Sequence, residues 1–209
     1  MVRDIVIVGA GGFGREVVWT LERINAGIET WRILGFADDD PAKAGKSFDG
    51  YPVLGTVAHV AADHPGASVF IALGDNARRE QIYTQLRGCD FARIVDPSAV
   101  VAPTIDLRHG VFIGPQAVVS VGVQIGKFAL VNARTSLGHD CILGDFAQIC
   151  PGATLSGNTT VGDHAFIGSN ASTCPGIRIG AHAKVAAGMP VFAHVAEGET
   201  VSPFGAWKR

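Results

Sequence analysis

Large aliphatic residues recur every six positions through the second half of the chain. Sixteen of the 17 positions in this aliphatic ladder are Ile, Leu or Val, Thr173 is the exception, and no residue interrupts the spacing. Helical periodicity cannot produce a period of six, and simple strand alternation does not require one. The ladder consists of Val95, Val101, Leu107, Ile113, Val119, Ile125, Val131, Leu137, Leu143, Ile149, Leu155, Val161, Ile167, Thr173, Ile179, Val185 and Val191.

Two smaller residue types accompany the ladder. Four positions after an aliphatic residue comes a small apolar one, at Ala117, Ala129, Ala147, Ala153, Ala165, Ala171 and Ala183. Directly after it glycine is frequent, at Gly114, Gly126, Gly138, Gly144, Gly162, Gly168 and Gly180. We expect a large inward residue, a glycine turn that tolerates positive φ, and a small inward residue in each unit. This pattern is typical of a hexapeptide β-helix, with three units per coil and room for five to six coils between Val95 and about Ala196. An ordinary β-sandwich would not hold one period over this length.

The coil predicts which side chains stack. Residues 18 positions apart should lie above one another, about 4.8 Å per coil. The position five after each aliphatic residue should point outward, which gives one column of Phe112, Leu130, Gln148 and Phe166. An exposed apolar stripe of this kind indicates self-association. Cover by the tail or by the first domain is the alternative.

The first half predicts a small parallel α/β domain. Residues 4–24 (DIVIVGAGGFGREVVWTLERI) indicate a strand, a glycine turn and a helix. Residues 32–40 predict a second strand, and residues 68–87 a third strand, a loop and a helix. The segment RIVDPSA marks the join, so we predict a Rossmann-like domain over 1–92 and a β-helix domain with a short C-terminal tail over 93–209.

The first domain carries a candidate phosphate loop. Gly9, Gly11 and Gly14 form a GxGxxG motif directly after an apolar strand, where backbone N–H groups can approach a phosphate at a helix N-terminus. A domain of this length holds half of a dinucleotide fold, so a nucleotide-linked sugar fits better than NAD. A docking domain whose glycines only make a turn is the alternative. The predicted sugar-nucleotide-binding residues are Gly9, Gly11, Gly12, Phe13, Gly14, the possible ribose-binding Asp38, Gly74 and Asn76.

Charge and composition exclude several function classes. The net charge is −2 and basic runs are absent, so we expect no nucleic-acid partner. Apolar segments of the length that a membrane helix needs are absent too, and the N-terminus reads as a strand and turn, which predicts a cytoplasmic protein. The four cysteines (Cys89, Cys141, Cys150 and Cys174) have no zinc spacing, so we expect reduced thiols and no metal.

His139 and Asp140 are the candidate catalytic pair. They stand between two Leu-Gly pairs in TSLGHDCILGD, and Gly157 follows His139 by 18 positions, one coil later. Histidine suits proton removal near neutral pH, and a neighbouring carboxylate can fix its tautomer. A glycine N–H can approach an oxyanion closely. Taken alone the pair would more often be surface decoration, but the register favours catalysis.

The order of these parts resembles a known family. GAGGFGRE, IALGDNARR and VNARTSLGHDCILGDFAQICPGATLSG together resemble the sialic acid O-acetyltransferase and bacillosamine-type nucleotide-sugar N-acetyltransferase family of hexapeptide-repeat acyltransferases, over residues 1–195. The resemblance implies a left-handed parallel β-helix, acetyl-CoA as co-substrate and a homotrimer that binds it between subunits. It also implies His139 as the general base, Asp140 as the acid that orients it, Asn132 lining the site, and Gly157 as donor to the thioester carbonyl.

Three positions depart from the family pattern. Gln148 stands where the family often has a second histidine, and Phe13 stands in the glycine loop where several relatives have histidine. The tail VSPFGAWKR also differs, although Trp207, Lys208 and Arg209 could meet adenine or phosphates. The departures put in doubt what Gln148 does for the acetyl donor or acceptor and what Phe13 does for the nucleotide sugar.

The predicted activity is acetyl transfer from acetyl-CoA to the amine of a nucleotide-linked amino sugar. A sugar hydroxyl, as in sialic acid, is the alternative acceptor, and a non-catalytic sugar-nucleotide-binding protein or an NAD oxidoreductase would belong to other classes. A zinc-dependent carbonic anhydrase of the γ class shares the coil, but its histidine spacing is absent. His109, His164, His182 and His194 are expected in solvated turns.

Overall fold

The structure is a computed structural model that describes residues 2–203, except for the side chain of Ala61. Two compact units divide the chain, one up to Ile94 and one from Val95 onward. The expected join lies two residues earlier, after residue 92. Trp207, Lys208 and Arg209 lie outside the described residues, so their predicted contacts with the acetyl donor stay predictions.

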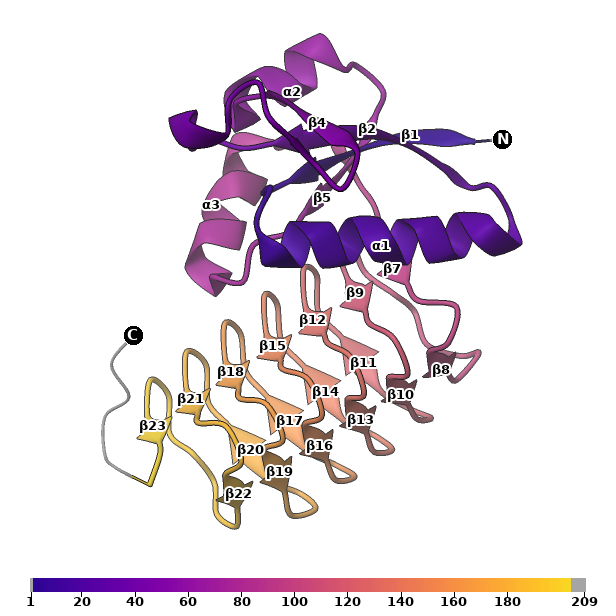
Figure 1. The fold of residues 1–209 in the computed structure, drawn as a ribbon. Helices are drawn as coiled ribbons and strands as arrows, with labels where there is room; N and C mark the ends of the chain where they lie inside the picture. The colour runs from indigo at the N-terminus through magenta and orange to yellow at the C-terminus, as the bar shows by residue number, and fades with distance from the viewer. Residues whose placement is uncertain (1, 204–209) are drawn as a thin grey trace. The chain divides into compact units, whose positions relative to one another are not determined.

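The first unit contains one six-stranded sheet (Figure 1). Neighbouring strands run parallel except for the antiparallel pair β3–β4. Four residues of the central strand β1 and all of β5 are buried, because helices and loops cover the sheet. In sheet order the strands are β3 (Ser47–Phe48), β4 (Tyr51–Gly55), β2 (Trp31–Ala37), β1 (Arg3–Val8), β5 (Ser68–Ile71) and β6 (Asp90–Phe91).

The helices of the first unit follow the strands in alternation. They are α1 (Gly12–Gly27), the short 3-10 turn η1 (Pro41–Lys43), α2 (Val57–Asp63) and α3 (Asn76–Gln85). The strand, glycine turn and helix expected at the start are present, as are the expected second strand and the third strand with its helix. The pair β3–β4 and the elements α2 and β6 were not predicted, because segments this short carry little periodic signal.

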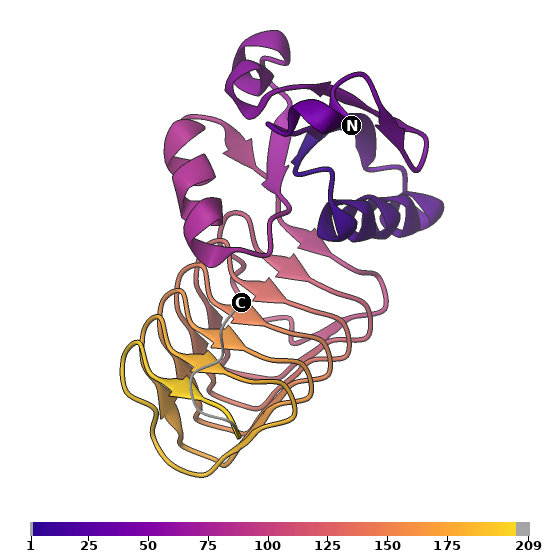
Figure 2. The ribbon, with the colours of Figure 1, turned by 60° about the vertical axis from the view of Figure 1, so that its left-hand side comes forward.

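The second unit is a β-helix of two-residue strands (Figure 2). Its strands form three parallel sheets, here named the β13 face, the β14 face and the β15 face. The β13 face comprises β8 (Val100–Val101), β10 (Val118–Val119), β13 (Ser136–Leu137), β16 (Thr154–Leu155), β19 (Ser172–Thr173) and β22 (Pro190–Val191). The β14 face comprises β11 (Gln124–Ile125), β14 (Ile142–Leu143), β17 (Thr160–Val161) and β20 (Arg178–Ile179). The β15 face comprises β7 (Ile94–Val95), β9 (Phe112–Ile113), β12 (Leu130–Val131), β15 (Gln148–Ile149), β18 (Phe166–Ile167), β21 (Lys184–Val185) and β23 (Thr200–Val201).

The predicted register of 18 residues per coil is confirmed. Leu130 pairs with Phe112 on one side and with Gln148 on the other. The last coil is two residues shorter, since Lys184 pairs with Thr200. From Ile113 to Val191 the ladder residues are buried, and so are the expected alanines. One continuous apolar core therefore fills the β-helix.

The expected role of the glycines that follow the ladder residues is wrong. Positive φ occurs two positions later, as at Gln116 (57°), Asp140 (59°) and Phe146 (57°), whereas Gly114, Gly138 and their equivalents do not adopt it. These glycines instead allow close approach of the next coil. A Cβ atom on Gly162, for example, would stand 2.5 Å from the backbone nitrogen of Ala181.

The expected exposed stripe on the β15 face is wrong at two of its four positions. Phe112 and Leu130 retain only 2% and 1% of their surface, so both are covered within one chain, as the alternative allowed. Gln148 and Phe166 are half-buried. The stripe therefore offers little apolar surface for a second copy.

Candidate active site

His139 lies on the turn that joins β13 to β14, where the chain passes from the β13 face to the β14 face. We name this edge of the β-helix the His139 corner. The N–H of Asp140 donates to the carbonyl of Val121 in the preceding coil (3.0 Å), and the N–H of Asn158 donates to the carbonyl of His139 (2.9 Å). The turn is thus held from both neighbouring coils, which fixes where the His139 side chain starts.

The imidazole and the adjacent carboxylate form the expected pair. His139 Nδ1 lies 2.8 Å from Asp140 Oδ2, and both side chains are more than half exposed. An ionised carboxylate only accepts hydrogen bonds, so it favours the tautomer that carries its proton on Nδ1. Nε2 then keeps a free lone pair, as a general base requires.

Gly157 faces the same imidazole from the next coil. A Cβ atom on Gly157 would stand 2.5 Å from His139 Nε2, so the ring packs directly against the glycine. Within residues 2–203 the N–H of Gly157 donates to no acceptor. The structure therefore brings the predicted base together with a main-chain donor that is available to a ligand.

Gly122 is a further residue of the site that the sequence reasoning missed. It precedes Asp140 by one coil, and a Cβ atom at Gly122 would overlap Asp140 Oδ1. The glycine leaves the space in which the carboxylate turns toward His139. The signal that could have found it is the spacing of 18 residues between Gly122 and Asp140.

Asn132 and Gln148 do not join His139 within one chain. Asn132 begins the turn between the β15 face and the β13 face, is 8% exposed, and donates from Nδ2 to the carbonyl of Ile149 (2.8 Å). Gln148 lies on the β15 face and points its amide toward Cys150 Sγ (3.7 Å). Their predicted place in the acetyl-CoA or acceptor site stays a prediction.

A cavity of about 580 Å³ lies beside the His139 corner. Gly122 and Ile142, which flank the corner, line one part of it. Arg108 and Lys127 line another part, and Lys127 forms an ion pair with Asp145 (3.4 Å). The cavity provides room for part of a polar ligand next to Asp140.

The predicted nucleotide-binding loops meet at one edge of the first sheet. They follow β2, β1 and β5, which are neighbouring parallel strands, so their carboxyl ends lie together. Ligands of open α/β sheets bind at this edge. Asn76 begins α3 there, and Phe13 lies half-buried in the first turn of α1.

The glycines of these loops divide into two kinds. A Cβ atom at Gly14 would overlap the carbonyl oxygen of Gly9, and Gly9 itself has a φ of 106° and close contacts with Ala72 and Leu73. These two glycines are required by the packing of strand and helix. Nothing lies within 4 Å of a Cβ atom built on Gly11, Gly12 or Gly74, so those positions leave open space for a ligand.

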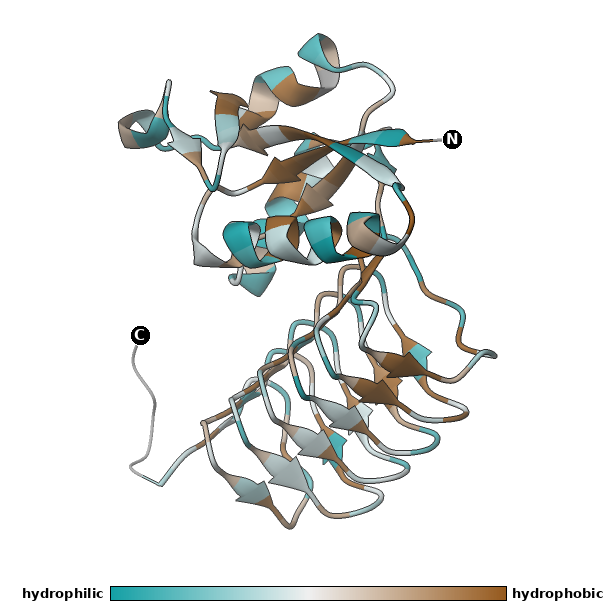
Figure 3. Ribbon diagram, turned by 45° about the vertical axis from the view of Figure 1, so that its right-hand side comes forward, coloured by the Kyte–Doolittle hydropathy of each residue, from teal (hydrophilic) through white to brown (hydrophobic). Residues whose placement is uncertain are grey.

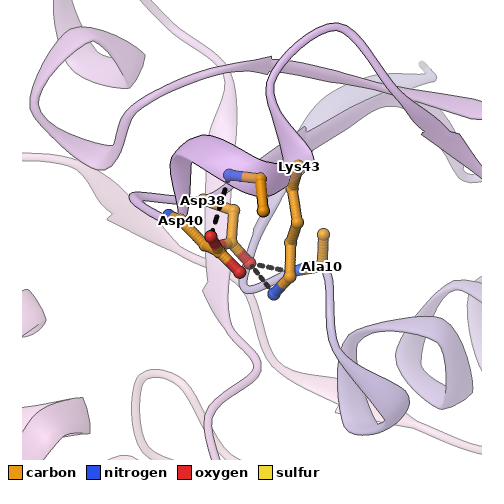
Figure 4. A network of polar contacts seen from close by, with 5 residues as sticks. Ala10, Asp38, Asp40 and Lys43 are labelled. Carbon is orange, nitrogen blue, oxygen red and sulfur yellow. Dashed lines mark hydrogen bonds and ion pairs between the residues drawn. The ribbon is translucent and has the colours of Figure 1, made fainter.

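Asp38 has structural partners inside the loop (Figure 4). Its Oδ2 accepts from the N–H of Ala10 (2.7 Å) and from Lys43 Nζ (2.7 Å), and its Oδ1 accepts from the N–H of Asp40 (3.0 Å). Burial disfavours the charged form, but the hydrogen bonds outweigh it, so the pKa of Asp38 lies below its ordinary value. A ribose hydroxyl would compete with these donors, and ribose binding by Asp38 stays a prediction.

Comparison with known proteins identifies relatives of both units. The family described as PglD N-terminal domain matches residues 4–86, and the hexapeptide repeat of succinyl-transferase matches residues 158–193. The GDP-perosamine N-acetyltransferase of Escherichia coli O157:H7 is 31% identical over 150 residues, which cover 70% of this chain and 67% of that protein. The chain belongs to the family of nucleotide-sugar acetyltransferases.

Solved structures agree with this membership of the acetyltransferase family. The acetyltransferase domain of PglB from Neisseria gonorrhoeae FA1090, in complex with acetyl coenzyme A, has a TM-score of 0.88 at 30% identity and covers 99% of each chain. A histidine mutant of perosamine N-acetyltransferase from Caulobacter crescentus, in complex with CoA and GDP-perosamine, has a TM-score of 0.87 at 29% identity and covers 96% of this chain and 93% of that one. The predicted family and the predicted enzyme class, an acyltransferase, are confirmed.

The remaining histidines of the acetyltransferase do not form a metal site. Among the described residues there is no group of three or more His, Cys, Asp or Glu side chains that could hold a metal ion. His164 and His182 instead continue a ring stack that begins with Phe128 and Phe146, with centroid distances of 5.1, 5.1 and 4.9 Å. The expectation of a solvated turn is therefore wrong for the half-buried His164, because residues 18 apart stack at one corner.

Within residues 2–203 there is also no helix that combines the length and the apolar character needed to cross a membrane.

Proposed function

We propose that this protein transfers the acetyl group of acetyl-CoA to the amine of a nucleotide-linked amino sugar. The observation that carries the proposal is the arrangement at the His139 corner. Asp140 holds Nδ1 of the imidazole at 2.8 Å, and Nε2 packs against Gly157, whose N–H has no acceptor within residues 2–203. A base and an oxyanion donor thus stand one coil apart in a member of this family.

Each group has one role in the proposed reaction. The neutral amine attacks the thioester carbonyl carbon while His139 Nε2 accepts its proton. The carbonyl oxygen gains the negative charge and receives the N–H of Gly157. Collapse of the tetrahedral intermediate breaks the carbon–sulfur bond, and the imidazolium returns the proton to the leaving CoA sulfur. Asp140 keeps the ring in the required tautomer and stabilises the imidazolium.

The first unit supplies the proposed nucleotide site. Gly11, Gly12 and Gly74 leave open space at the carboxyl edge of the sheet, where the N-terminus of α1 offers unpaired N–H groups. Both relatives that act on or bind GDP-perosamine support a GDP-linked 4-amino sugar as the first acceptor to test.

The left-handed winding and the homotrimer implied by the family resemblance belong to the same proposal. In the second unit the exposed large apolar residues are Val100, Val118, Val121, Ile142 and Phe192, and all five lie on the β13 face, the β14 face or the His139 corner between them. The outward valines belong to the first coils, where the β-helix is most apolar (Figure 3). Contact between copies around this corner could bring Asn132 and Gln148 of a neighbour toward His139.

A thiol-release assay with acetyl-CoA tests the activity. The acceptors are GDP-, UDP- and dTDP-linked amino sugars, the matching 4-hydroxy sugars, free amino sugars and sialic acid, and mass spectrometry assigns each product as an amide or an ester. We expect release with an amino nucleotide sugar and an amide product. Release only with hydroxyl acceptors would replace N-acetylation by O-acetylation, and acetyl-CoA binding without release from any acceptor would overturn the enzymatic proposal.

A further inference from the structure

Three polar side chains occupy interior positions of the β-helix that are apolar in most coils. Thr173 takes a place in the aliphatic ladder, and Cys141 and Thr159 lie in the column of small inward residues behind the His139 corner. Their exposed fractions are 6%, 0% and 0%. Burial of a hydroxyl group costs free energy unless a hydrogen bond replaces water, so the partners of these groups are informative.

The two threonines close a ring of hydrogen bonds on Ser156. The N–H of Ser156 donates to Thr173 Oγ1 (3.1 Å), and Thr159 Oγ1 donates to the carbonyl of Ser156 (2.7 Å). The two hydroxyl oxygens lie 2.9 Å apart. Because Thr159 spends its single proton on the carbonyl, Thr173 must be the donor between them. We name Ser156, Thr159 and Thr173 the hydroxyl ring.

Cys141 adds a second donor to the same carbonyl. Its Sγ lies 3.3 Å from the Ser156 oxygen. Burial raises the pKa of the Cys141 thiol, so the sulfur keeps the hydrogen that it donates. The Ser156 carbonyl therefore accepts two hydrogen bonds from residues that sit inside the core directly behind His139 and Gly157.

We infer that the hydroxyl ring and Cys141 position and polarise the Gly157 N–H that faces the reacting thioester. The carbonyl of Ser156 and the N–H of Gly157 belong to one peptide group. Donation to the carbonyl draws electron density from the amide nitrogen, which makes the N–H a stronger donor through hydrogen-bond cooperativity. The inference rests on the proposed function, because it assigns Gly157 to the oxyanion. Thr159 and Thr173 act through Gly157 and are positioning residues.

The Thr173→Val substitution separates this role from a structural one. Valine is an ordinary residue of the ladder, so a purely structural threonine predicts unchanged or higher thermal stability and unchanged kcat. The inference predicts a similar midpoint of thermal unfolding and a kcat lower by about five- to tenfold, as for the loss of one hydrogen bond. KM for acetyl-CoA and for the sugar should change little, since the lost interaction strengthens in the transition state.

Serine variants provide the opposite combination. Thr173→Ser and Thr159→Ser keep the hydroxyl and lose a buried methyl group, so we expect kcat close to wild type with lower stability. Thr159→Val should lower kcat like Thr173→Val, and the double valine variant should lower it less than the product of the two, because both act on one peptide.

Thr135→Val is the matched control. Thr135 is 1% exposed and its hydroxyl donates to the carbonyl of Cys150 (3.4 Å), which belongs to a different peptide on another corner. It should leave kcat unchanged. Wild-type kcat in folded Thr173→Val and Thr159→Val, or an equal loss in Thr135→Val, would overturn the inference.

A measurement without turnover distinguishes failure of the inference from failure of the proposed function. In the full chain, the amide proton of Gly157 should resonate further upfield in Thr159→Val than in wild type, because its peptide loses a donor, while Thr135→Val leaves it in place. An unmoved Gly157 resonance would refute the polarisation even if acetyl transfer is established. A moved resonance in a protein that acetylates no acceptor would support the polarisation and remove the enzymatic proposal alone.

Discussion

The catalytic geometry of His139 depends on two glycines, one coil to either side. Gly157 gives the imidazole a flat surface to lie on, and Gly122 gives the Asp140 carboxylate its space. Asp140 itself has a φ of 59°, a conformation that aspartate tolerates better than most residues. Side chains on either coil would move the pair, so the site is built from the absence of Cβ atoms as much as from the two titratable groups.

Replacement of the proposed base gives the first prediction. His139→Ala should lower kcat by about 10²–10⁴-fold, because the amine then loses its proton only to water. The side chain is 58% exposed, so the midpoint of thermal unfolding should stay near wild type. His182→Ala, at an exposed histidine on another corner, is the control and should keep most activity. Wild-type turnover in folded His139→Ala would refute the assignment.

A pair of glycine variants tests whether Gly157 serves the site or the fold. Gly157→Ala pushes against a movable imidazole, whereas Gly162→Ala pushes against the backbone nitrogen of Ala181, each at 2.5 Å. We expect Gly157→Ala to reduce kcat by about 10²-fold with little loss of stability, since both base and oxyanion donor shift. Gly162→Ala should cost about 1–3 kcal/mol of unfolding free energy, as overpacking does, and spare kcat per folded molecule. The reverse outcome would remove Gly157 from the site.

The sequence alone sufficed for part of this site. The spacing of 18 residues placed Gly157 beside His139, because the coil length follows from the ladder. Gly122 escaped notice since the same rule was not applied backward from Asp140. Thr173 was visible only as an exception to the ladder. Its partners Ser156 and Thr159 are set by side-chain rotamers inside the corner, which no periodic pattern reports.

At the scale of elements, periodicity predicted the strands well and the turns poorly. The ladder fixed every strand pair of the central coils, because inward and outward positions alternate on a rigid repeat. The turn conformation was misjudged since glycine has two uses. It permits positive φ, but it also permits backbones to approach, and here Gly138 and its equivalents serve the second use.

Asp38 offers a prediction about the loops of the first sheet. Its carboxylate joins the loop after β1 to η1 through Ala10 and Lys43, and its pKa lies below the ordinary value of 3.8. The ionised form therefore stabilises the first unit above pH 3.8, and this contribution is lost as the pH falls through the lowered pKa. Asp38→Asn should cost about 1–3 kcal/mol of unfolding free energy near pH 7, since the replaced acceptor was charged.

Denaturant unfolding followed by tryptophan fluorescence measures the effect, because Trp31 is buried next to this sheet edge. The difference between Asp38→Asn and wild type should shrink as the pH approaches the lowered pKa. Asp106→Asn, at a carboxylate that is 84% exposed in the second unit, should show no such difference. A pH-independent cost for Asp38→Asn would mean that shape rather than charge holds the loop.

At the scale of the whole molecule, the sequence placed the self-association surface on the wrong face. Outward positions were predicted correctly, but exposure depends on what covers them, and Phe112 and Leu130 are covered. The remaining exposed apolar side chains surround the His139 corner instead. An assembly through this region would give the base an enclosed environment that a single exposed corner lacks.

Val118→Glu tests this assembly. The side chain is 42% exposed on the β13 face, and a carboxylate buried there without a partner would cost about 3–5 kcal/mol per contact. Light scattering of the wild type should give three times the 21.8 kDa of one chain, and Val118→Glu should shift the mass toward that of one chain. Since the neighbour would contribute Asn132 and Gln148, acetyl transfer should fall with the trimer fraction and recover at high protein concentration. Lys184→Glu, an exposed charge change on the β15 face, should leave mass and activity alone. A trimeric, fully active Val118→Glu protein would move the contact to another surface, and a monomeric, active wild type would show that one His139 corner suffices.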